Sequence, residues 1–319
     1  MSCLRMIGVV IGLGLLAPLL FQGQVSIEPR QRPVPKEKEQ GPRPPVLRVD
    51  TNLVLVPVSV NDRLNRPVSG LEKEHFRIFD DHVEQAITHF AMDDEPTAVG
   101  LVFDTSGSMG GKLRRSRMAA TAFFRTANPE DEFFLVEFDS YPKLVVPLTQ
   151  DTGHIENQLL FSRSKGSTAL LDAIYLGLHE IKKSKKNKKA LLVISDGGDN
   201  HSHYSSGEVR NVLRESDVLI YAIGVFGGAR MPEEYSGPGF LSRIAEPSGG
   251  HMFVESGAGA ADIAQKIGIE LRNRYVLGYT PHDEPRDGRY HHVVVRVIPP
   301  RGLPPLRAHW RTGYYAPVD

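Results

Sequence analysis

The sequence predicts an α/β protein with a doubly wound, mostly parallel sheet and a smaller β-rich module formed by the two flanks of the chain. Two observations support this prediction. In the central region, continuous apolar runs such as "AVGLVFD" and "ALLVISD" alternate with helix-like stretches, the pattern of a parallel sheet covered on both faces. In the flanks the apolar runs are short, β-branched or aromatic, and separated by Pro and Gly, as in antiparallel strands.

The composition limits the classes of function. A chain of 319 residues can form one large domain and a smaller one, each with its own core. Lys plus Arg and Asp plus Glu both number 38, so the formal net charge is zero. A function that depends on bulk charge, such as nucleic-acid or anionic-membrane binding, is therefore not expected. Cys3 is the only cysteine, and a mature chain without it has no disulfide.

The N-terminal 45 residues read as a leader followed by a tether. Residues 1–23 place Arg5 before an apolar run, which is the layout of a secretory signal peptide. The run is short for a membrane span and contains Pro18, and an uncleaved anchor stays the alternative. Residues 24–45 are rich in Pro and charge and predict an extended linker. We expect an exported protein, periplasmic or secreted, with membrane attachment only through an uncleaved N-terminal segment.

The flanks of the central region carry strand signals. Residues 46–94 form a β-rich segment, in which "HFRIFDDHVEQAITHF" predicts two short strands around a polar turn at Asp80 and Asp81. Two or three strands alone are marginally stable. Residues 280–319, together with "RYVLGYTP" just before them, supply further strands. We predict that both flanks pack into one β module and that the larger domain, 97–279, is inserted between them.

The larger domain shows a regular order of strands and helices. Its strand-like runs are "AVGLVFD", "EFFLVEFDS", "ALLVISD" and "DVLIYAIGVF". Its helix-like stretches are "GKLRRSRMAATAFFRTA", "STALLDAIYLGLHEIKK", "SSGEVRNVLRES" and "GAADIAQKIGIELRNR". "KLVVPLTQ" predicts an extra edge strand, and the Gly- and Pro-rich "AIGVFGGARMPEEYSGPGF" predicts a long connection. Sheets of this class bind ligands at the C-terminal ends of their strands.

Polar residues with oxygen donors collect at those strand ends. Asp104, Ser106 and Ser108 follow the first run, Asp196 follows the third, and Thr168 lies at the start of a helix. Two carboxylates and three hydroxyls can therefore converge on one face. Oxygen ligands without His or Cys suit Mg²⁺, and secondarily Mn²⁺ or Ca²⁺, rather than zinc. Neutral hydroxyls cancel little of the charge of the ion, which leaves it attractive to a carboxylate from a partner.

This pattern resembles the von Willebrand factor A domain and its metal-ion-dependent adhesion site, with the order Asp-x-Ser-x-Ser, Thr, Asp. The resemblance implies that Ser106, Ser108 and, in the ligand-bound state, Thr168 contact the ion directly. It also implies that Asp104 and Asp196 act mostly through coordinated waters. The order of leader, β segment, A domain, "RYVLGYTP" and "RTGYYAP" resembles a secreted bacterial VWFA-related family of the acidobacterial type.

Catalytic interpretations of the first loop lack essential parts. A Walker phosphate loop fails because Lys112 precedes Leu113 and Ser106 replaces the required earlier glycine. A hydrolase elbow fails because Ser106 also replaces the first glycine around Ser108. Aspartyl-phosphate transfer from Asp104 lacks the usual second Asp. The pair His201 and His203 follows Asp196, but no third ligand for a softer metal is in view.

We therefore predict a protein that is not an enzyme and has no catalytic residues. It would be an adhesion or assembly module that binds a protein partner when an Asp or Glu of that partner completes the coordination of Mg²⁺. A metal-independent structural or assembly protein of the cell envelope is one alternative. A Mg²⁺-dependent phosphohydrolase is the other.

Overall fold

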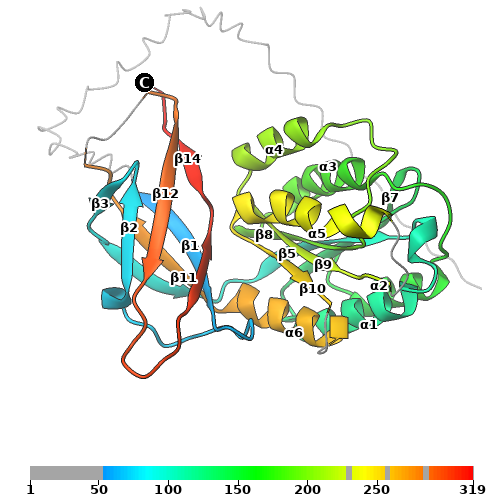
Figure 1. Cartoon of the computed structure of the whole chain (residues 1–319), viewed down its shortest axis with the longest axis horizontal. Helices are drawn as coiled ribbons and strands as arrows, with labels where there is room; N and C mark the ends of the chain where they lie inside the picture. Colours follow the sequence, from blue (N-terminus) through cyan, green and yellow to red (C-terminus); the bar gives the residue numbers. More distant parts are fainter. Residues whose placement is uncertain (1–52, 228–231, 256–258, 283–286, 319) are drawn as a thin grey trace, which may run out of the picture. The chain divides into compact units, whose positions relative to one another are not determined.

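The computed structural model describes residues 53–227, 232–255, 259–282 and 287–318, all of which belong to one unit of the chain. The predicted leader and linker lie outside the described residues. Strands from both ends of the chain form two four-stranded antiparallel sheets (Figure 1). Their orders are β13-β1-β11-β4 and β14-β12-β2-β3. The first contains β1 (Val54–Asn61), β4 (His89–Asp93), β11 (Arg274–Tyr279) and β13 (Arg307–Trp310), and the second contains β2 (Phe76–Asp80), β3 (Val83–Gln85), β12 (Tyr290–Val297) and β14 (Gly313–Tyr315).

One apolar core lies within these two sheets. Alternate residues of β1, Val56, Val58 and Val60, are buried, as expected for strands that present one face to a core. They belong to the same cluster as Ile78 of β2 and Leu277 of β11. Since β1 pairs with β11 and β2 pairs with β12, the predicted β module built from both flanks is confirmed.

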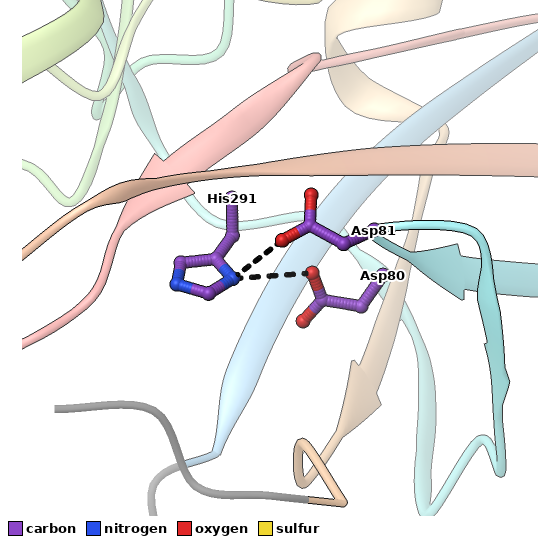
Figure 2. A group of neighbouring side chains, drawn as sticks. All are labelled: Asp80, Asp81 and His291. Carbon is purple, nitrogen blue, oxygen red and sulfur yellow. Dashed lines mark ion pairs between the residues drawn. The ribbon is translucent and has the colours of Figure 1, made fainter. Parts of the chain in front are cut away.

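A tight turn joins β2 to β3, at the place where the sequence predicts one. Asp80 pairs with Val83, and the two residues between them, Asp81 and His82, have positive φ angles of 42° and 74°. Two consecutive positive φ angles are the mark of a type I′ hairpin turn, whose twist suits antiparallel strands. The turn brings Asp80 and Asp81 beside His291 of β12 (Figure 2).

The larger domain contains a six-stranded sheet in the order β10-β9-β8-β5-β6-β7. Its strands are β5 (Thr97–Asp104), β6 (Glu132–Phe138), β7 (Pro142–Thr149), β8 (Lys188–Ser195), β9 (Val218–Gly224) and β10 (Met252–Val254). All neighbours pair in parallel except β7, which runs antiparallel to β6 at the edge. The doubly wound fold class and the extra edge strand are both confirmed.

Helices cover both faces of this sheet (Figure 1). The α-helices are α1 (Leu113–Phe124), α2 (Thr152–Phe161), α3 (Leu170–Glu180), α4 (Ser206–Glu215), α5 (Pro232–Ala245) and α6 (Gly259–Arg272), and the 3-10 turns are η1 (Lys73–His75), η2 (Gly107–Met109), η3 (Ile181–Lys183) and η4 (Glu246–Ser248). Residues of α1, α2 and α6 share one buried cluster with the sheet, and residues of α3, α4 and α5 share another. Helix α5 occupies the second half of the segment predicted as a long connection, so that prediction was wrong there.

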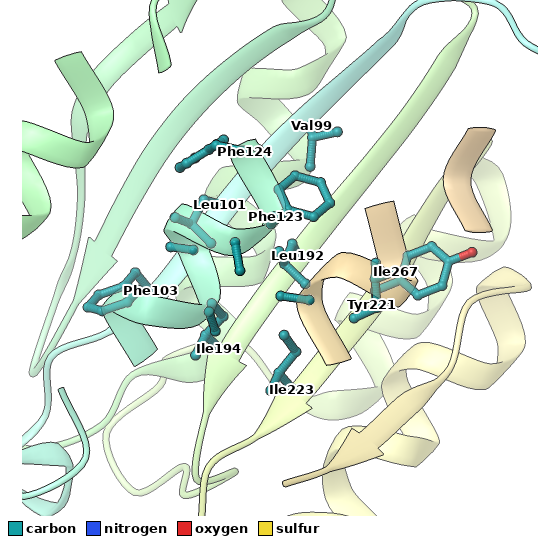
Figure 3. Close-up of a cluster of buried hydrophobic side chains, with 14 of the residues drawn as sticks. Val99, Leu101, Phe103, Phe123, Phe124, Leu192, Ile194, Tyr221, Ile223 and Ile267 are labelled. Atoms are coloured by element: carbon teal, nitrogen blue, oxygen red, sulfur yellow. The ribbon is translucent and has the colours of Figure 1, made fainter. Parts of the chain in front are cut away.

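The strands alternate between the two clusters, which explains their continuous apolar sequences. Val99, Leu101 and Phe103 of β5 pack in the cluster with α1 and α6 (Figure 3). Ala98 and Val102, on the opposite face of the same strand, pack in the cluster with α3. Every residue of β5 is buried, including Asp104 at its C-terminal end. The carboxylate of Asp104 therefore lies at the edge of the sheet but out of contact with bulk water.

Candidate metal centre

Asp104 is held by two protein donors at the end of β5. Its Oδ1 accepts a hydrogen bond from the backbone N–H of Ser106 at 2.8 Å, and its Oδ2 accepts one from the Ser195 hydroxyl at 2.5 Å. The residue is fully buried, and this burial raises the pKa of the Asp104 carboxyl to about 7, against the opposing effect of these hydrogen bonds. Because each of its two oxygens accepts a hydrogen bond, the carboxylate is fixed in orientation.

Ser106 and Ser108 bring two hydroxyls together in the turn that follows. Ser106 precedes the 3-10 turn η2, and its Oγ lies 3.2 Å from the Oγ of Ser108. Met109, fully buried, anchors the turn in the core. Neighbouring ligands of an octahedral ion with bonds of about 2.1 Å lie about 3 Å apart. The separation of the two hydroxyls therefore fits two adjacent ligands of one Mg²⁺.

Asp196 lies directly after β8 and forms a buried ion pair. Its Oδ2 is 2.9 Å from the ammonium of Lys112, and its Oδ1 accepts a hydrogen bond from the N–H of Gly198. The side chains of Lys112 and Asp196 are 7% and 0% exposed. The sequence suggests Lys112 only as the lysine of a phosphate-binding loop and does not predict this ion pair. Its position just before α1, close in sequence to Ser106 and Ser108, is the one feature that points to a role at the site.

Thr168 belongs to a third loop, which is bound to the loop after β8. Its N–H donates to the side-chain oxygen of Asn200 at 2.9 Å, and its carbonyl accepts from the N–H groups of Asn200 and His201 at 3.0 Å. Thr168 is 4% exposed and stands two residues before α3. The predicted threonine therefore lies beside the loop that carries Asp196.

The same third loop is also bound to the turn that carries the serines. The Ser164 hydroxyl donates to the carbonyl of Ser106 at 2.7 Å, and the N–H of Gly107 donates to the carbonyl of Gly166 at 3.0 Å. Hydrogen bonds thus join all three loops that contain the predicted residues. The side-chain donors predicted to hold the ion are all oxygen atoms, which suit a hard divalent cation. The ammonium of Lys112 lies beside them as the ion-pair partner of Asp196.

His201 and His203 have other partners. The Nδ1 of His203 lies 2.9 Å from Oδ2 of Asp172, whose Oδ1 accepts from the N–H groups of His203 and Tyr204. Burial raises the pKa of Asp172, but these hydrogen bonds and the nearby imidazole outweigh it and lower the pKa below its usual value. The His201 ring contacts Tyr141 edge-on. These contacts place both histidines at the rim of the loop and give no support to a softer-metal site there.

Comparison with known proteins identifies the domain. The sequence profile of the von Willebrand factor type A domain family matches residues 99–198, which include all five predicted site residues. The chain therefore contains a von Willebrand factor type A domain. The predicted extent of that domain, residues 97–279, and the resemblance of the whole chain to a secreted bacterial family stay predictions.

Individual relatives are distant. An uncharacterized protein of Borreliella burgdorferi is 26% identical over 168 residues, which is 49% of each chain, so the match spans about half of that relative. The vWF domain of the type V pili tip protein Mfa5 from Porphyromonas gingivalis is 14% identical, with a TM-score of 0.46 and coverage of 56% of this chain and 97% of that one. A von Willebrand factor type A protein from Catenulispora acidiphila is 12% identical, with a TM-score of 0.46 and coverage of 84% and 74%.

No helix in the described part of the chain combines the length and the apolar character needed to cross a bilayer.

Proposed function

We propose that this protein is a non-enzymatic adhesion or assembly module that binds a protein partner through Mg²⁺. The observation that carries the proposal is the pair of serine hydroxyls 3.2 Å apart in a turn that is hydrogen-bonded to the loop of Thr168. Asp104, just before this turn, accepts a hydrogen bond from Ser195, the neighbour of Asp196. Ser106, Ser108 and Thr168 would hold the ion directly. Asp104 and Asp196 would hold its water ligands. The bound ion would supply a positive charge that attracts a carboxylate of the partner.

The charge balance of the site supports carboxylate capture. Asp104 and Asp196 are both buried, and the ammonium of Lys112 offsets one of their charges. With both carboxylates ionised, these three groups sum to one negative charge, and a divalent ion turns the sum to one positive charge. An Asp or Glu from the partner then neutralises the site. A buried centre with a single excess positive charge favours an anionic ligand strongly, because little water screens it.

A cavity beside the site has the surface chemistry of a protein interface. It measures about 700 Å³, and its lining includes Thr105, next to Ser106. Three basic residues, Lys143, Arg163 and Lys165, and two acidic ones, Glu137 and Asp139, also line it. Two large aromatic side chains, Tyr141 and Phe161, line it and are 64% and 78% exposed. Aromatic residues and Arg are enriched in protein interfaces, and the positive charge of Arg163 complements an acidic segment of a partner.

The proposal is tested by calorimetric titration of the purified protein with Mg²⁺, Mn²⁺ and Ca²⁺. We expect Ser106→Ala and Ser108→Ala each to weaken Mg²⁺ binding by about tenfold or more, since each removes a direct ligand. Ser69→Ala, at an exposed serine of the β module, is the matched control. Equal Mg²⁺ affinity in wild type and Ser106→Ala would contradict the proposal.

The nature of the partner is tested separately. A random peptide library is panned on the protein in Mg²⁺ and eluted with a chelator. We expect the enriched peptides to share an Asp or Glu whose replacement by Asn or Gln abolishes binding. Peptides that bind equally well in chelator would instead support the metal-independent assembly protein, in which the Lys112 ammonium already serves as the cation of Asp196.

We also propose that the protein is exported and acts in the periplasm or outside the cell. The support is the signal-peptide layout of residues 1–23. Fractionation of cells and N-terminal sequencing of the mature chain test it, and a cytoplasmic chain that keeps Met1 would overturn it.

A further inference from the structure

We propose that the β module carries a second metal site, formed by Asp80, Asp81 and His291, which binds a transition-metal dication, with Zn²⁺ the best fit. This site lies outside the von Willebrand factor type A domain and does not depend on the function proposed above. Its residues come from both flanks of the chain. Asp80 and Asp81 lie at the β2–β3 turn, and His291 lies on β12, which pairs with β2 (Figure 2).

The three side chains direct one donor atom each toward a common point. The Nδ1 of His291 is 2.8 Å from Oδ2 of Asp81 and 3.9 Å from Oδ1 of Asp80, and all three atoms lie within 4.8 Å of one another. A tetrahedral zinc ion with bonds of about 2.0 to 2.1 Å separates its ligand atoms by about 3.4 Å. The two separations from Nδ1 lie on either side of that value, and small side-chain rotations would bring the three donors to tetrahedral spacing.

One buried oxygen in this group lacks a hydrogen-bond partner. Asp80 is 5% exposed, and its Oδ2 accepts hydrogen bonds from the hydroxyls of Tyr279 and Tyr314, both at 2.9 Å. Its Oδ1 is buried without any hydrogen bond and faces His291. Buried carboxylate oxygens are rarely left without a partner. A carboxylate with hydrogen bonds on one oxygen and none on the other is well placed to bind a cation through the second oxygen.

The other two residues are oriented by further contacts in the same way. The Nε2 of His291 is 3.3 Å from Oδ1 of Asp287, and the imidazole stacks on the ring of Tyr314. Asp81 uses its Oδ1 to accept the N–H of His292 at 2.9 Å, which leaves Oδ2 for the site. A carboxylate on the outer nitrogen of a histidine is the usual partner of a metal ligand, because it fixes the ring with the other nitrogen free to bind.

The donor set separates this site from the serine site. An imidazole nitrogen with two carboxylate oxygens suits Zn²⁺, and also Mn²⁺ or Fe²⁺, better than Mg²⁺. Three protein ligands leave a fourth position for water or for a group from another molecule. A bound ion would also cross-link the β2–β3 turn of the N-terminal flank to β12 of the C-terminal flank.

The test uses untagged full-length protein, loaded with Zn²⁺, dialysed and analysed for metal content, with Zn²⁺ titrations by calorimetry. We expect wild type to retain zinc. His291→Gln should lose it, and Asp81→Asn, which keeps a residue tolerant of positive φ, should bind it about tenfold more weakly. His292→Gln, on the exposed face of the same strand, and Ser106→Ala should behave as wild type.

Two results would overturn the proposal. One is failure of folded wild type to take up zinc, which would leave His291 as the cation of an ordinary ion-pair cluster. The other is equal zinc retention in wild type and in His291→Gln, with both folded by circular dichroism. Tyr314→Phe gives a further check, since removing a donor to Asp80 should weaken zinc binding by about 10- to 100-fold while leaving all three ligands in place.

Discussion

Asp104 ends β5 and Asp196 directly follows the neighbouring strand β8, but their carboxylates have different partners. Asp104 receives its hydrogen bonds from a hydroxyl and a backbone N–H, whereas Asp196 is paired with an ammonium. Because its hydrogen-bond donors are neutral, burial dominates the pKa of Asp104 and raises it, and the nearby charge of Asp196 adds to the rise. The supporting residues Ser195 and Lys112 thus decide how much negative charge the candidate site offers to an ion.

Replacing Ser195 by Ala should weaken the candidate site without removing any proposed ligand. The change removes the hydroxyl that donates to Asp104 Oδ2 and leaves a buried oxygen without this partner. We expect a loss of about 1 to 3 kcal/mol in the free energy of unfolding and about 10- to 100-fold weaker Mg²⁺ binding. Urea denaturation and calorimetry measure the two effects. Unchanged Mg²⁺ affinity would mean that Asp104 does not position the ion.

Lys112→Met should make the stability of the protein depend on Mg²⁺. It removes the buried cation of Asp196 and leaves a carboxylate at 0% exposure without that charge. Breaking a buried pair from one side costs about 3 to 5 kcal/mol. We expect saturating Mg²⁺ to recover part of this loss, measured as the denaturation midpoint with and without the ion. A loss that Mg²⁺ does not change would contradict the binding of the ion beside Asp196.

Some side chains of the two candidate sites could be predicted from the sequence, and others could not because their neighbours are set by the tertiary fold. Asp104 ends a buried strand, Asp196 follows another, and Ser106 and Ser108 lie in the turn just after Asp104, so their place at the sheet edge can be predicted from the chain itself. Ser195 was read as the last residue of an apolar strand, although a buried hydroxyl there needs a partner. The grouping of Asp80 with His291 depends on which strands pair, and local sequence does not determine that.

Helix α6 approaches the end of α1 so closely at Gly268 that there is no room for a side chain there. A Cβ added to Gly268 of α6 would lie 1.9 Å from the Thr126 hydroxyl, just beyond the end of α1. We expect Gly268→Ala to lower the free energy of unfolding by about 1 to 3 kcal/mol, because the helices must move apart. Thermal and urea denaturation measure the change.

Gly207→Ala provides the matched control for that prediction. Gly207 lies in the first turn of α4, and an added Cβ there would approach nothing closer than the Ser205 hydroxyl at 3.8 Å. Because Ala has the higher helix propensity, this change should be neutral or slightly stabilising. Equal losses in the two variants would contradict the close-approach argument for Gly268.

The order of strands and helices could be predicted where the apolar pattern was strong. The prediction failed where Gly and Pro made a helix look like a loop. The strands of the larger sheet were predicted because they are apolar throughout, a consequence of burial on both faces. Helix α5 was predicted as a connection because it contains Gly and Pro. Pro232 opens the helix, where proline is tolerated, and packing of Leu241 and Ile244 in the core offsets the poor propensity of the rest.

For the molecule as a whole, a buried carboxylate links the β module to the larger domain. Glu270 of α6 is 1% exposed and accepts hydrogen bonds from Asn61 of β1 at 2.7 Å and from Tyr221 of β9 at 2.8 Å. His251 lies beside it and stacks on His309 of β13, with ring centroids 3.9 Å apart. Polar contacts, rather than apolar ones alone, therefore join these elements.

The two stacked histidines should make stability fall in mild acid. Burial lowers the pKa of His251 to about 3 and that of His309 to about 4, with the Arg274 charge adding to the shift of His251. The unfolded chain binds protons near pH 6.5, whereas the folded state does so only near pH 3 to 4. Their contribution is therefore complete above pH 6.5 and is lost as pH falls toward 4, by about 1.4 kcal/mol per pH unit for each histidine.

His309→Phe tests this, since it keeps a ring stacked on His251 and removes one titrating group. We expect a smaller loss of unfolding free energy than in wild type between pH 6.5 and pH 4.5, measured by urea denaturation at several pH values. The comparison with wild type is needed because the raised pKa of Asp104 acts in the opposite direction over this range. His154→Phe, at an exposed histidine, is the control. Parallel curves for His309→Phe and wild type would contradict the prediction.

The strand pair β4–β11 has a consequence for how such a chain can be varied. Asp93 at the end of β4 pairs with Arg274 at the start of β11, so the polypeptide leaves and re-enters the β module at neighbouring positions of one ladder. A short turn could connect those two residues and close a hairpin in the same register. The segment between these two strands, which contains the von Willebrand factor type A domain, thus occupies the place of a hairpin loop in the β module.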